Sequence, residues 1–303
     1  MPTVSAIVPA YNAEAFLARA IRSVEAQSFR DFEIVVVDDG STDETADALH
    51  GFSGVRLIRQ PHLGAAAARN RAVDEATGEL LAFLDADDEW LPEKLARQLQ
   101  FMNELGSSFS YTDSYFLRGG RRQRYSALAH PYRGEILSPL IEDWLDQAFI
   151  TINTVVVSRA LVKSVGGFER GIPTASNEDY GLWLKLALGG TRFDYLDEPL
   201  AIYHRGHESD SSDTVAMVER HRVALEYFST AYDFPAEARG QITTALARSN
   251  TTLAVELVKK HRFREAMPHL RRSSLRDFAR KGRLFISRRT GRVRPEDPAR
   301  DHS

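Results

Sequence analysis

Three aspartates follow directly after an unbroken apolar segment, in the sequence LLAFLDADDEW at residues 80–90. Asp85 and Asp87 are two positions apart, so their carboxylates point to the same side of an extended chain. Two such carboxylates repel each other unless a positive charge lies between them. Their oxygens suit a hard divalent ion, Mn²⁺ or Mg²⁺, and these ions usually bind substrate phosphates as well. The spacing indicates a site for a metal ion and a phosphorylated substrate.

The same acidic residues have a second, structural interpretation. Pro92 can open a helix over residues 92–102, since proline is favoured at the first helical position. Aspartates are common as turn and cap residues before a helix, and Asp88 suits that role. The neighbouring segments must decide between the two interpretations.

Apolar segments alternate with helical patterns through the first part of the chain. Strands are expected at residues 4–9, 33–37, 55–60 and 80–84, and helices at 13–27, before 50, and at 64–76. This alternation predicts an α/β fold with a mostly parallel sheet and right-handed crossovers. Open α/β sheets bind ligands beyond the carboxyl ends of their strands. Polar residues follow the first, second and fourth strands, so they are expected to meet at that edge.

A cleft at this edge would have the size of a nucleotide. Tyr11 could stack on a base, Asp39 could accept a hydrogen bond from a base or ribose, and Arg69 could neutralise a phosphate. Structural roles remain open for all three. Tyr11 could simply cover the sheet edge, Asp39 could cap the second helix, and Arg69 could pair with Asp74.

The chain beyond residue 100 is less regular. Strands are expected at residues 107–117 and 150–157, and a short helix at 158–165, whereas 121–146 lacks a clear period. The sequence SNEDYGLWLKLAL predicts a further helix capped by Ser176 or Asn177. Glu178 and Asp179 fall in its first turn, where the helix dipole favours acidic residues.

Four segments of the first 90 residues form a recognisable set: VSAIVPAYNAE at 4–14, IVVVDDGSTDET at 34–45, GAAAARN at 64–70 and LLAFLDADDEW. Together they resemble family 2 glycosyltransferases with the GT-A fold. Their order and spacing also agree, and the resemblance extends over about residues 3–210. It implies a GT-A domain at residues 1–212 that transfers a sugar from a nucleotide donor with inversion, using Mn²⁺ or Mg²⁺.

The resemblance also implies roles for single residues on the donor side. Pro9, Tyr11 and Asp39 would hold the nucleoside, and Arg69 would lie near the base or diphosphate. Asp85 would lie beside the ribose and Asp87 would bind the metal. Two positions depart from the family pattern: His62 stands where Asn is frequent, and Ala72 where Gly is frequent.

On the acceptor side, the resemblance makes Asp179 the general base and Glu178 a residue that orients it or contacts the acceptor. A sugar hydroxyl needs a positioned carboxylate to take its proton as it attacks. PLAIYHRGH at 199–207 resembles the closing YRxH element, so Arg205 and His207 would reach the diphosphate or metal. The match is imperfect, because Tyr203 lies two residues before the arginine.

Residues 213–303 lie outside the resemblance and are expected to form a helical accessory region, with helices at 215–232, 235–260 and 264–280. From residue 215 onward the chain carries 19 Lys and Arg against 10 Asp and Glu, although the whole protein has a net charge of -3. Residues 280–294 combine basic side chains with Leu284, Phe285 and Ile286. This segment could contact an anionic membrane surface or form an exposed tail; nucleic acid is not the expected partner.

Composition restricts the remaining possibilities. The chain of 303 residues is 43% hydrophobic and has no cysteine, which excludes disulfides and zinc–thiolate sites. No segment reaches the roughly 18 apolar residues of a membrane span, and the N-terminus does not resemble a signal peptide. We expect a cytoplasmic protein, with membrane contact limited to the inner face.

These observations predict an inverting, metal-dependent glycosyltransferase. The expected donor is a UDP-sugar, and the expected acceptor is a carbohydrate or a lipid-linked glycan of polysaccharide or cell-envelope synthesis. One alternative is a nucleotide-sugar binding module without catalysis, although the intact acidic motifs argue against it. Another is a sugar nucleotidyltransferase, but residues 8–14 lack the usual glycine-rich, basic loop of that class.

Overall fold

A computed structural model describes residues 1–118, 121–127, 131–142, 149–174, 176–204 and 214–273. Within these ranges, one mixed sheet has the strand order β3-β2-β1-β4-β8-β6-β9-β5, with β7 paired to β6. The strands are β1 Val4–Ala10, β2 Phe32–Asp38, β3 Val55–Arg59, β4 Leu80–Phe83, β5 Glu89–Trp90, β6 Phe109–Arg118, β7 Arg121–Arg124, β8 Val156–Ser158 and β9 Asp194–His204. The described α-helices are α1 Leu17–Glu25, α2 Ala65–Glu75, α3 Lys94–Leu105, α4 Leu137–Glu142, α5 Arg159–Ser164, α6 Glu178–Leu188, α7 Thr214–Ala231, α8 Ala236–Lys259 and α9 Phe263–Arg272.

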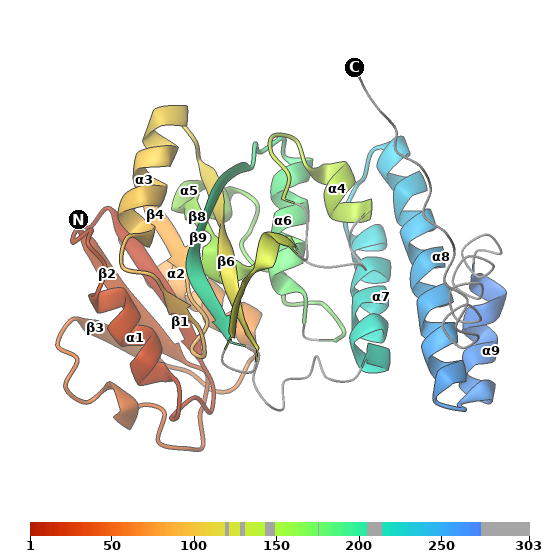
Figure 1. Ribbon diagram of the computed structural model, residues 1–303, viewed down its shortest axis with the longest axis horizontal. Helices are drawn as coiled ribbons and strands as arrows, with labels where there is room; N and C mark the ends of the chain where they lie inside the picture. The colour runs from red at the N-terminus through yellow and green to blue at the C-terminus, as the bar shows by residue number, and fades with distance from the viewer. Residues whose placement is uncertain (119–120, 128–130, 143–148, 175, 205–213, 274–303) are drawn as a thin grey trace.

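The directions of the strands place the residues of the expected site at one edge of the sheet. β1 runs parallel to β2 and β4, and β2 runs parallel to β3. β8 is antiparallel to both β4 and β6, so β4 and β6 run the same way, and β9 is parallel to β6. The carboxyl ends of these parallel strands lie on one edge, at the bottom of Figure 1. The predicted α/β fold with a mostly parallel sheet is confirmed.

Helices cover both faces of the sheet because the central strands are apolar on both sides. Ile7 and Val35 pack on one face with residues of α2 and α6, whereas their neighbours Val8 and Val36 pack on the other with α1 and α3. An unbroken apolar strand of this kind is typical of a parallel sheet buried between two helical layers. The layers fix the strands, and the strands fix the loops at the carboxyl edge.

Two expected elements differ from the structure. The helix expected before residue 50 is only a 3₁₀ turn, Asp47–Leu49. Side chains in the preceding segment bond the loop after β1 instead: Ser41 Oγ accepts from Asn12 N, and Thr45 Oγ1 accepts from Ala13 N at 2.7 Å. The strand expected at 150–157 is shortened to β8, because Ile152–Thr154 forms another 3₁₀ turn.

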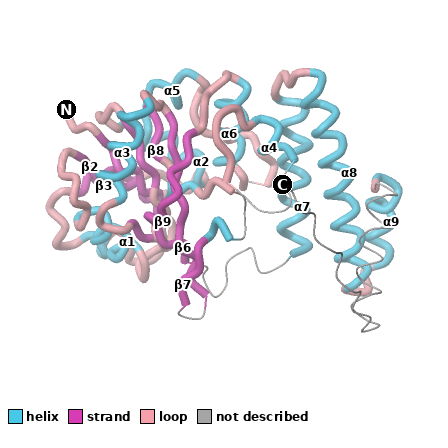
Figure 2. The backbone as a smooth tube through the Cα atoms, turned by 45° about the horizontal axis from the view of Figure 1, so that its top comes forward, coloured by secondary structure: helices cyan, strands magenta, loops and turns pink. Residues whose placement is uncertain are grey.

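The C-terminal helices form a stack at one end of the molecule (Figures 1 and 2). Leu225 and Phe228 of α7 belong to the same core cluster as the sheet face under α2. A Cβ atom at Gly181 of α6 would lie 2.9 Å from the Phe228 ring, so this glycine allows α6 and α7 to approach closely. The helical character of 214–272 is confirmed, and the division into domains at 212/213 stays a prediction. The last 30 residues lie outside the described part.

Candidate active site

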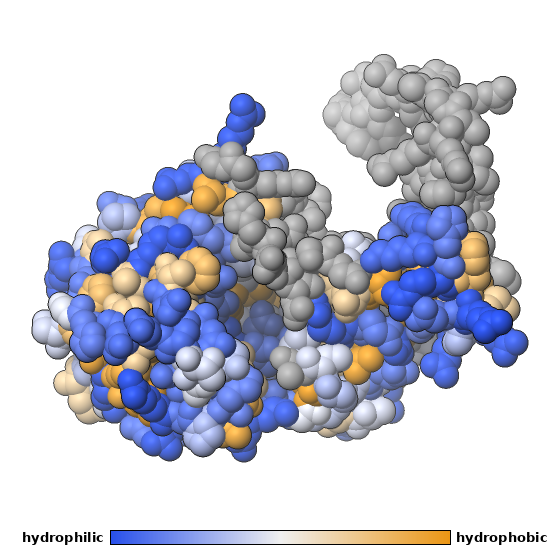
Figure 3. Space-filling view, turned by 90° about the horizontal axis from the view of Figure 1, so that it is seen from below, coloured by the Kyte–Doolittle hydropathy of each residue, from blue (hydrophilic) through white to orange (hydrophobic). Residues whose placement is uncertain are grey.

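A cleft of about 420 Å³ opens at the carboxyl edge of the sheet. It is lined by Pro9 of β1, Tyr11 after β1, Asp39 after β2, Arg69 of α2, and Asp85 and Asp87 after β4, together with His62 and nearby alanines. Figure 3 views the molecule from this side, and the surface is hollowed near its middle. A volume of this size falls in the range of small-molecule sites. The structure therefore brings together six of the residues singled out in the sequence.

Tyr11 and His62 form an aromatic pair at the cleft. Their ring centroids are 4.0 Å apart with an angle of 24° between the planes, and Tyr11 is 46% exposed. His62 Nδ1 lies 2.9 Å from Asp39 Oδ2. Sequence reasoning noted His62 only as a departure from the family pattern, and the stacking contact gives it a place in the cleft wall.

Asp39 is almost completely buried, at 2% exposure. Its carboxylate accepts hydrogen bonds from Gln60 Nε2 at 2.6 Å, Leu63 N at 3.0 Å and Gly64 N at 2.8 Å. Gly64, which precedes α2, has φ +89°, a conformation that favours glycine. Asp39 thus holds the loop at the start of α2 while also lining the cleft. It does not cap the second expected helix, whose place is taken by the 3₁₀ turn Asp47–Leu49.

Arg69 connects the two acidic motifs. It is 5% exposed, its Nη2 donates to Asp85 Oδ1 at 2.6 Å, and its Nη1 donates to Glu178. Asp74, the alternative partner, lies near Lys163 instead. Burial alone would lower the pKa of Arg69, but the negative charges of Asp85, Glu178 and Asp179 raise it. Arg69 is therefore a permanent cation among carboxylates.

Asp179 lies in the first turn of α6. Asn177 precedes the helix with φ +64° and makes no side-chain cap bond, so the expected side-chain cap at this position is wrong. Asp179 Oδ1 accepts from Tyr180 N at 2.8 Å. Burial of the carboxyl group and the neighbouring charge of Glu178 raise the pKa of Asp179 to about 7, against the opposing effect of Arg69. A carboxylate with this pKa suits a general base at neutral pH.

The loop after β4 is held from both sides. Arg19 Nη2 donates to the carbonyl oxygen of Asp87 at 2.6 Å. Asp88 is 1% exposed, and its carboxylate accepts from Asn153 Nδ2 at 2.6 Å and from His204 N at 2.9 Å. The proposed cap role of Asp88 is replaced by a link to β9. Sequence reasoning missed Arg19 and Asn153, since neither stands in a recognisable motif.

The carboxylates of Asp85 and Asp87 fit a divalent cation. Burial and the charge of Asp85 raise the pKa of Asp87, so a cation beside the two carboxylates would favour the charged form of Asp87. No cluster of three or more acidic or histidine residues suited to a metal occurs within the described ranges. An ion at Asp87 would therefore need further oxygens from the substrate, as is usual for Mg²⁺. Arg205 and His207 lie outside the described residues.

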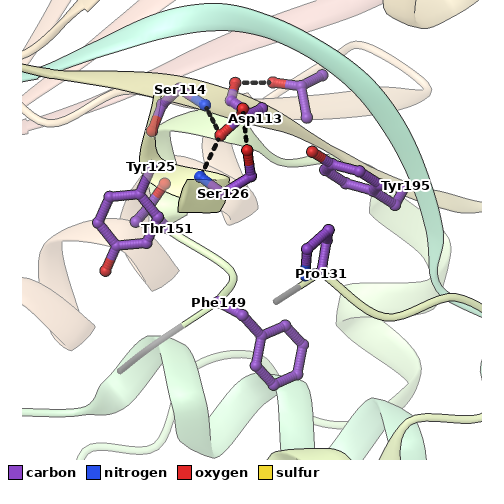
Figure 4. A pocket seen from close by; sticks show the side chains of 9 residues that line it. Asp113, Ser114, Tyr125, Ser126, Pro131, Phe149, Thr151 and Tyr195 are labelled. Atoms are coloured by element: carbon purple, nitrogen blue, oxygen red, sulfur yellow. Dashed lines mark hydrogen bonds between the residues drawn. The ribbon is translucent and has the colours of Figure 1, made fainter. Parts of the chain in front are cut away.

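A second cavity, shown in Figure 4, has a volume of only about 10 Å³. Asp113 of β6 lies in its wall, where its carboxylate accepts from Arg124 Nε at 2.6 Å and from Ser126 Oγ at 2.7 Å. Tyr195 and Phe149 line the opposite part. The space is sufficient for at most one water molecule, so it is not a site for a sugar.

The fold and the cleft define a nucleotide-sugar-dependent transferase of the GT-A class. Residues 5–158 match the family described as glycosyl transferase family 2. The chain therefore belongs to this family. Among curated proteins, it is 33% identical over 218 residues to "Putative teichuronic acid biosynthesis glycosyltransferase TuaG" of Bacillus subtilis, covering 70% of this chain and 82% of that one.

A second relative is the Escherichia coli UDP-Glc:alpha-D-GlcNAc-diphosphoundecaprenol beta-1,3-glucosyltransferase WfaP, 31% identical over 63% of this chain and 73% of WfaP. Among solved structures, residues 1–349 of Staphylococcus aureus TarS with UDP align with a TM-score of 0.61 and 19% identity, over 98% of this chain and 94% of that one. The Pyrobaculum calidifontis mannosyltransferase PcManGT with GDP-Man and Mn²⁺ aligns with a TM-score of 0.63 and 19% identity, over 94% and 80%. These structural likenesses support the GT-A fold.

Across the described residues, none of the helices combines the length and the apolar character needed to cross a bilayer.

Proposed function

We propose that this glycosyltransferase moves a sugar from a UDP-sugar to a lipid-linked or carbohydrate acceptor, with inversion at the anomeric carbon. The observation that carries the proposal is the bridge through Arg69. It joins Asp85, beside the donor cleft, to Glu178, next to Asp179. Through Arg69, which lines the cleft, the acidic loop on the donor side is thereby joined to the helix turn that carries Asp179.

The nucleoside occupies the part of the cleft between β1 and α2. Tyr11 offers an exposed ring for stacking, and Pro9 and Asp39 form the adjoining wall. The structures of one neighbour, TarS, in complex with UDP and with UDP-GlcNAc support a uridine donor. The Arg69 guanidinium bonds the carboxylates of Asp85 and Glu178 and fixes their positions. Asp85 faces the ribose.

Asp87 would hold the metal ion, with His207 as a further ligand and Arg205 near the diphosphate. When bound, Mn²⁺ or Mg²⁺ supplies positive charge to the departing diphosphate. PcManGT, whose structure contains Mn²⁺, supports this assignment. The chain itself holds Asp87 in position by two contacts. Arg19 donates to the backbone carbonyl oxygen of Asp87, and the carboxylate of the next residue, Asp88, accepts a hydrogen bond from His204 N of β9.

Asp179 accepts the proton of the acceptor hydroxyl while the oxygen of that hydroxyl attacks the anomeric carbon. The bond to the diphosphate breaks on the opposite side, and this geometry inverts the configuration. Glu178 orients Asp179 or contacts the acceptor. The pKa of about 7 keeps Asp179 basic enough to take a proton and partly ionised at neutral pH.

The acceptor is a lipid-linked glycan of polysaccharide or cell-envelope synthesis. WfaP is named for a diphosphoundecaprenol-linked acceptor and TuaG for teichuronic acid synthesis, which supports this class. The enzyme then acts on the cytoplasmic face of a membrane, and the basic C-terminal region contributes to that placement.

The proposal is tested with purified protein, Mn²⁺ and a panel of nucleotide sugars, measuring binding and slow donor hydrolysis. We expect one UDP-sugar to be bound and hydrolysed, and hydrolysis to stop when a chelator is added. If a donor binds tightly but is never hydrolysed or transferred, the chain is a binding module. If no donor binds, the proposal fails.

A further inference from the structure

The helix α9 is the outermost element of the helical stack (Figures 1 and 2). Its residue Ala266 is fully buried in a small cluster with Val218 of α7 and Leu253 and Leu257 of α8. One side of α9 is therefore fixed against α8. Phe263 and Met267, three positions before and one position after Ala266, flank this packed side of the helix.

These two flanking positions carry large apolar side chains that remain exposed. Phe263 is 56% exposed and Met267 is 50% exposed, and the two are one helical turn apart. Val258, at the end of α8, is 37% exposed. Residues spaced by four lie on the same face of a helix, so Phe263 and Met267 form a short apolar stripe.

Positive charge flanks this stripe. Arg264 and Arg271 are exposed and seven residues apart, which places them above one another on α9, beside Phe263 and Met267. Within the described part of the chain, neither guanidinium has an ion pair. Nearby cations differ in this respect, since Lys259 pairs with Glu256 and Arg262 with Glu265. We define the α9 outer face as Val258, Phe263, Arg264, Met267 and Arg271.

We propose that the α9 outer face docks on an anionic lipid bilayer. Helices that lie in a membrane interface combine an apolar stripe with adjacent Arg or Lys, so that the stripe enters the acyl boundary and the cations contact the headgroups. Charge complementarity favours a bilayer over nucleic acid, because phosphate-backbone binding would leave the Phe263 and Met267 side chains in water. An enzyme docked in this way reaches its lipid-linked acceptor at the bilayer surface. In that respect the inference rests on the proposed function.

The test uses the full chain and sedimentation with vesicles of phosphatidylcholine, alone or mixed with phosphatidylglycerol. We expect binding to the mixed vesicles and little binding to the neutral ones. Each cation near such a surface contributes about 1 kcal/mol, so the double variant Arg264→Gln/Arg271→Gln should bind about 30-fold more weakly. Phe263→Asp/Met267→Asp should abolish the binding.

Leu105→Asp is the matched control, since Leu105 is 50% exposed on α3, away from this face; it should bind as the unchanged protein does. All variants should hydrolyse a soluble UDP-sugar at the unchanged rate, which separates this inference from the proposed function. Equal vesicle binding by Phe263→Asp/Met267→Asp would overturn the inference and assign the contact to another segment. Failure of the unchanged protein to bind mixed vesicles, or a preference for DNA over them, would overturn it as well.

Discussion

Arg69 Nη2 donates a 2.6 Å hydrogen bond to Asp85, a residue 16 positions further along the chain. The same guanidinium reaches Glu178 on α6. This buried cation therefore joins the acidic loop after β4 to the first turn of α6.

Arg69→Ala should destabilise the fold. Removing one partner of a buried ion pair typically costs about 3–5 kcal/mol, because the remaining charge stays buried without a counterion. Denaturant unfolding measures the loss. The control is Arg71→Ala, whose exposed side chain pairs with Glu75 on the same helix and which should cost no more than about 1 kcal/mol. Equal losses would show that Arg69 does not stabilise the cluster.

Transfer activity should rise with pH through neutrality. Burial and Glu178 raise the pKa of Asp179 to about 7, so below this pH the carboxyl group is protonated and cannot accept the acceptor's proton. The pH profile of kcat/KM for the acceptor checks this, with donor binding measured at each pH as the control. A profile that is flat between about pH 5 and 8 would argue against Asp179 as the base.

Lys94 should make stability depend on pH. It is fully buried, donates to Gln98 Oε1 at 2.9 Å, and has a pKa lowered by burial to about 7. The unfolded chain, with the ordinary pKa of 10.5, binds more protons between these values, so stability should increase as pH rises from about 7 towards 10. Lys94→Met should remove this dependence, which denaturant unfolding at several pH values can detect. An unchanged slope would contradict the assignment.

Asn153 and Asp88 should act as one unit. Asn153 is fully buried, and its bond to Asp88 links the 3₁₀ turn before β8 to the acidic loop. Asn153→Ala leaves Asp88 without that donor and should cost about 1–3 kcal/mol. A double-mutant cycle with Asp88→Ala should show non-additive losses. Additive losses would mean that the two side chains stabilise the loop independently.

Strands β1, β2 and β4 could be predicted because each is a continuous apolar segment followed by polar residues. β1, β2 and β4 all begin and end within about two residues of the expected positions. β9 was not identified as a strand, since Asp194–His204 contains acidic residues and Pro199 that break the apolar pattern. The expected helix before residue 50 failed for a different reason: its polar side chains bond the loop at residues 12–14.

The composition of the cleft could be predicted from motifs, but the contacts inside it could not. The bridge from Arg69 to Glu178 joins residues 109 positions apart, and no local pattern encodes such a pairing. Asp88 also stands in the same motif as Asp87, yet its side chain bonds Asn153 and β9. Only the fold separates these two roles.

The most direct test compares Asp179→Asn with the unchanged protein, measuring UDP-sugar binding and transfer on the same preparations. Asn can still accept the hydrogen bond from Tyr180 N, so the fold and the donor cleft should be retained. General-base loss typically lowers rates by about 10²–10⁴-fold. We predict that transfer falls by this amount while donor affinity stays within a factor of about two. Undiminished transfer by Asp179→Asn would contradict the central claim that this carboxylate takes the acceptor's proton.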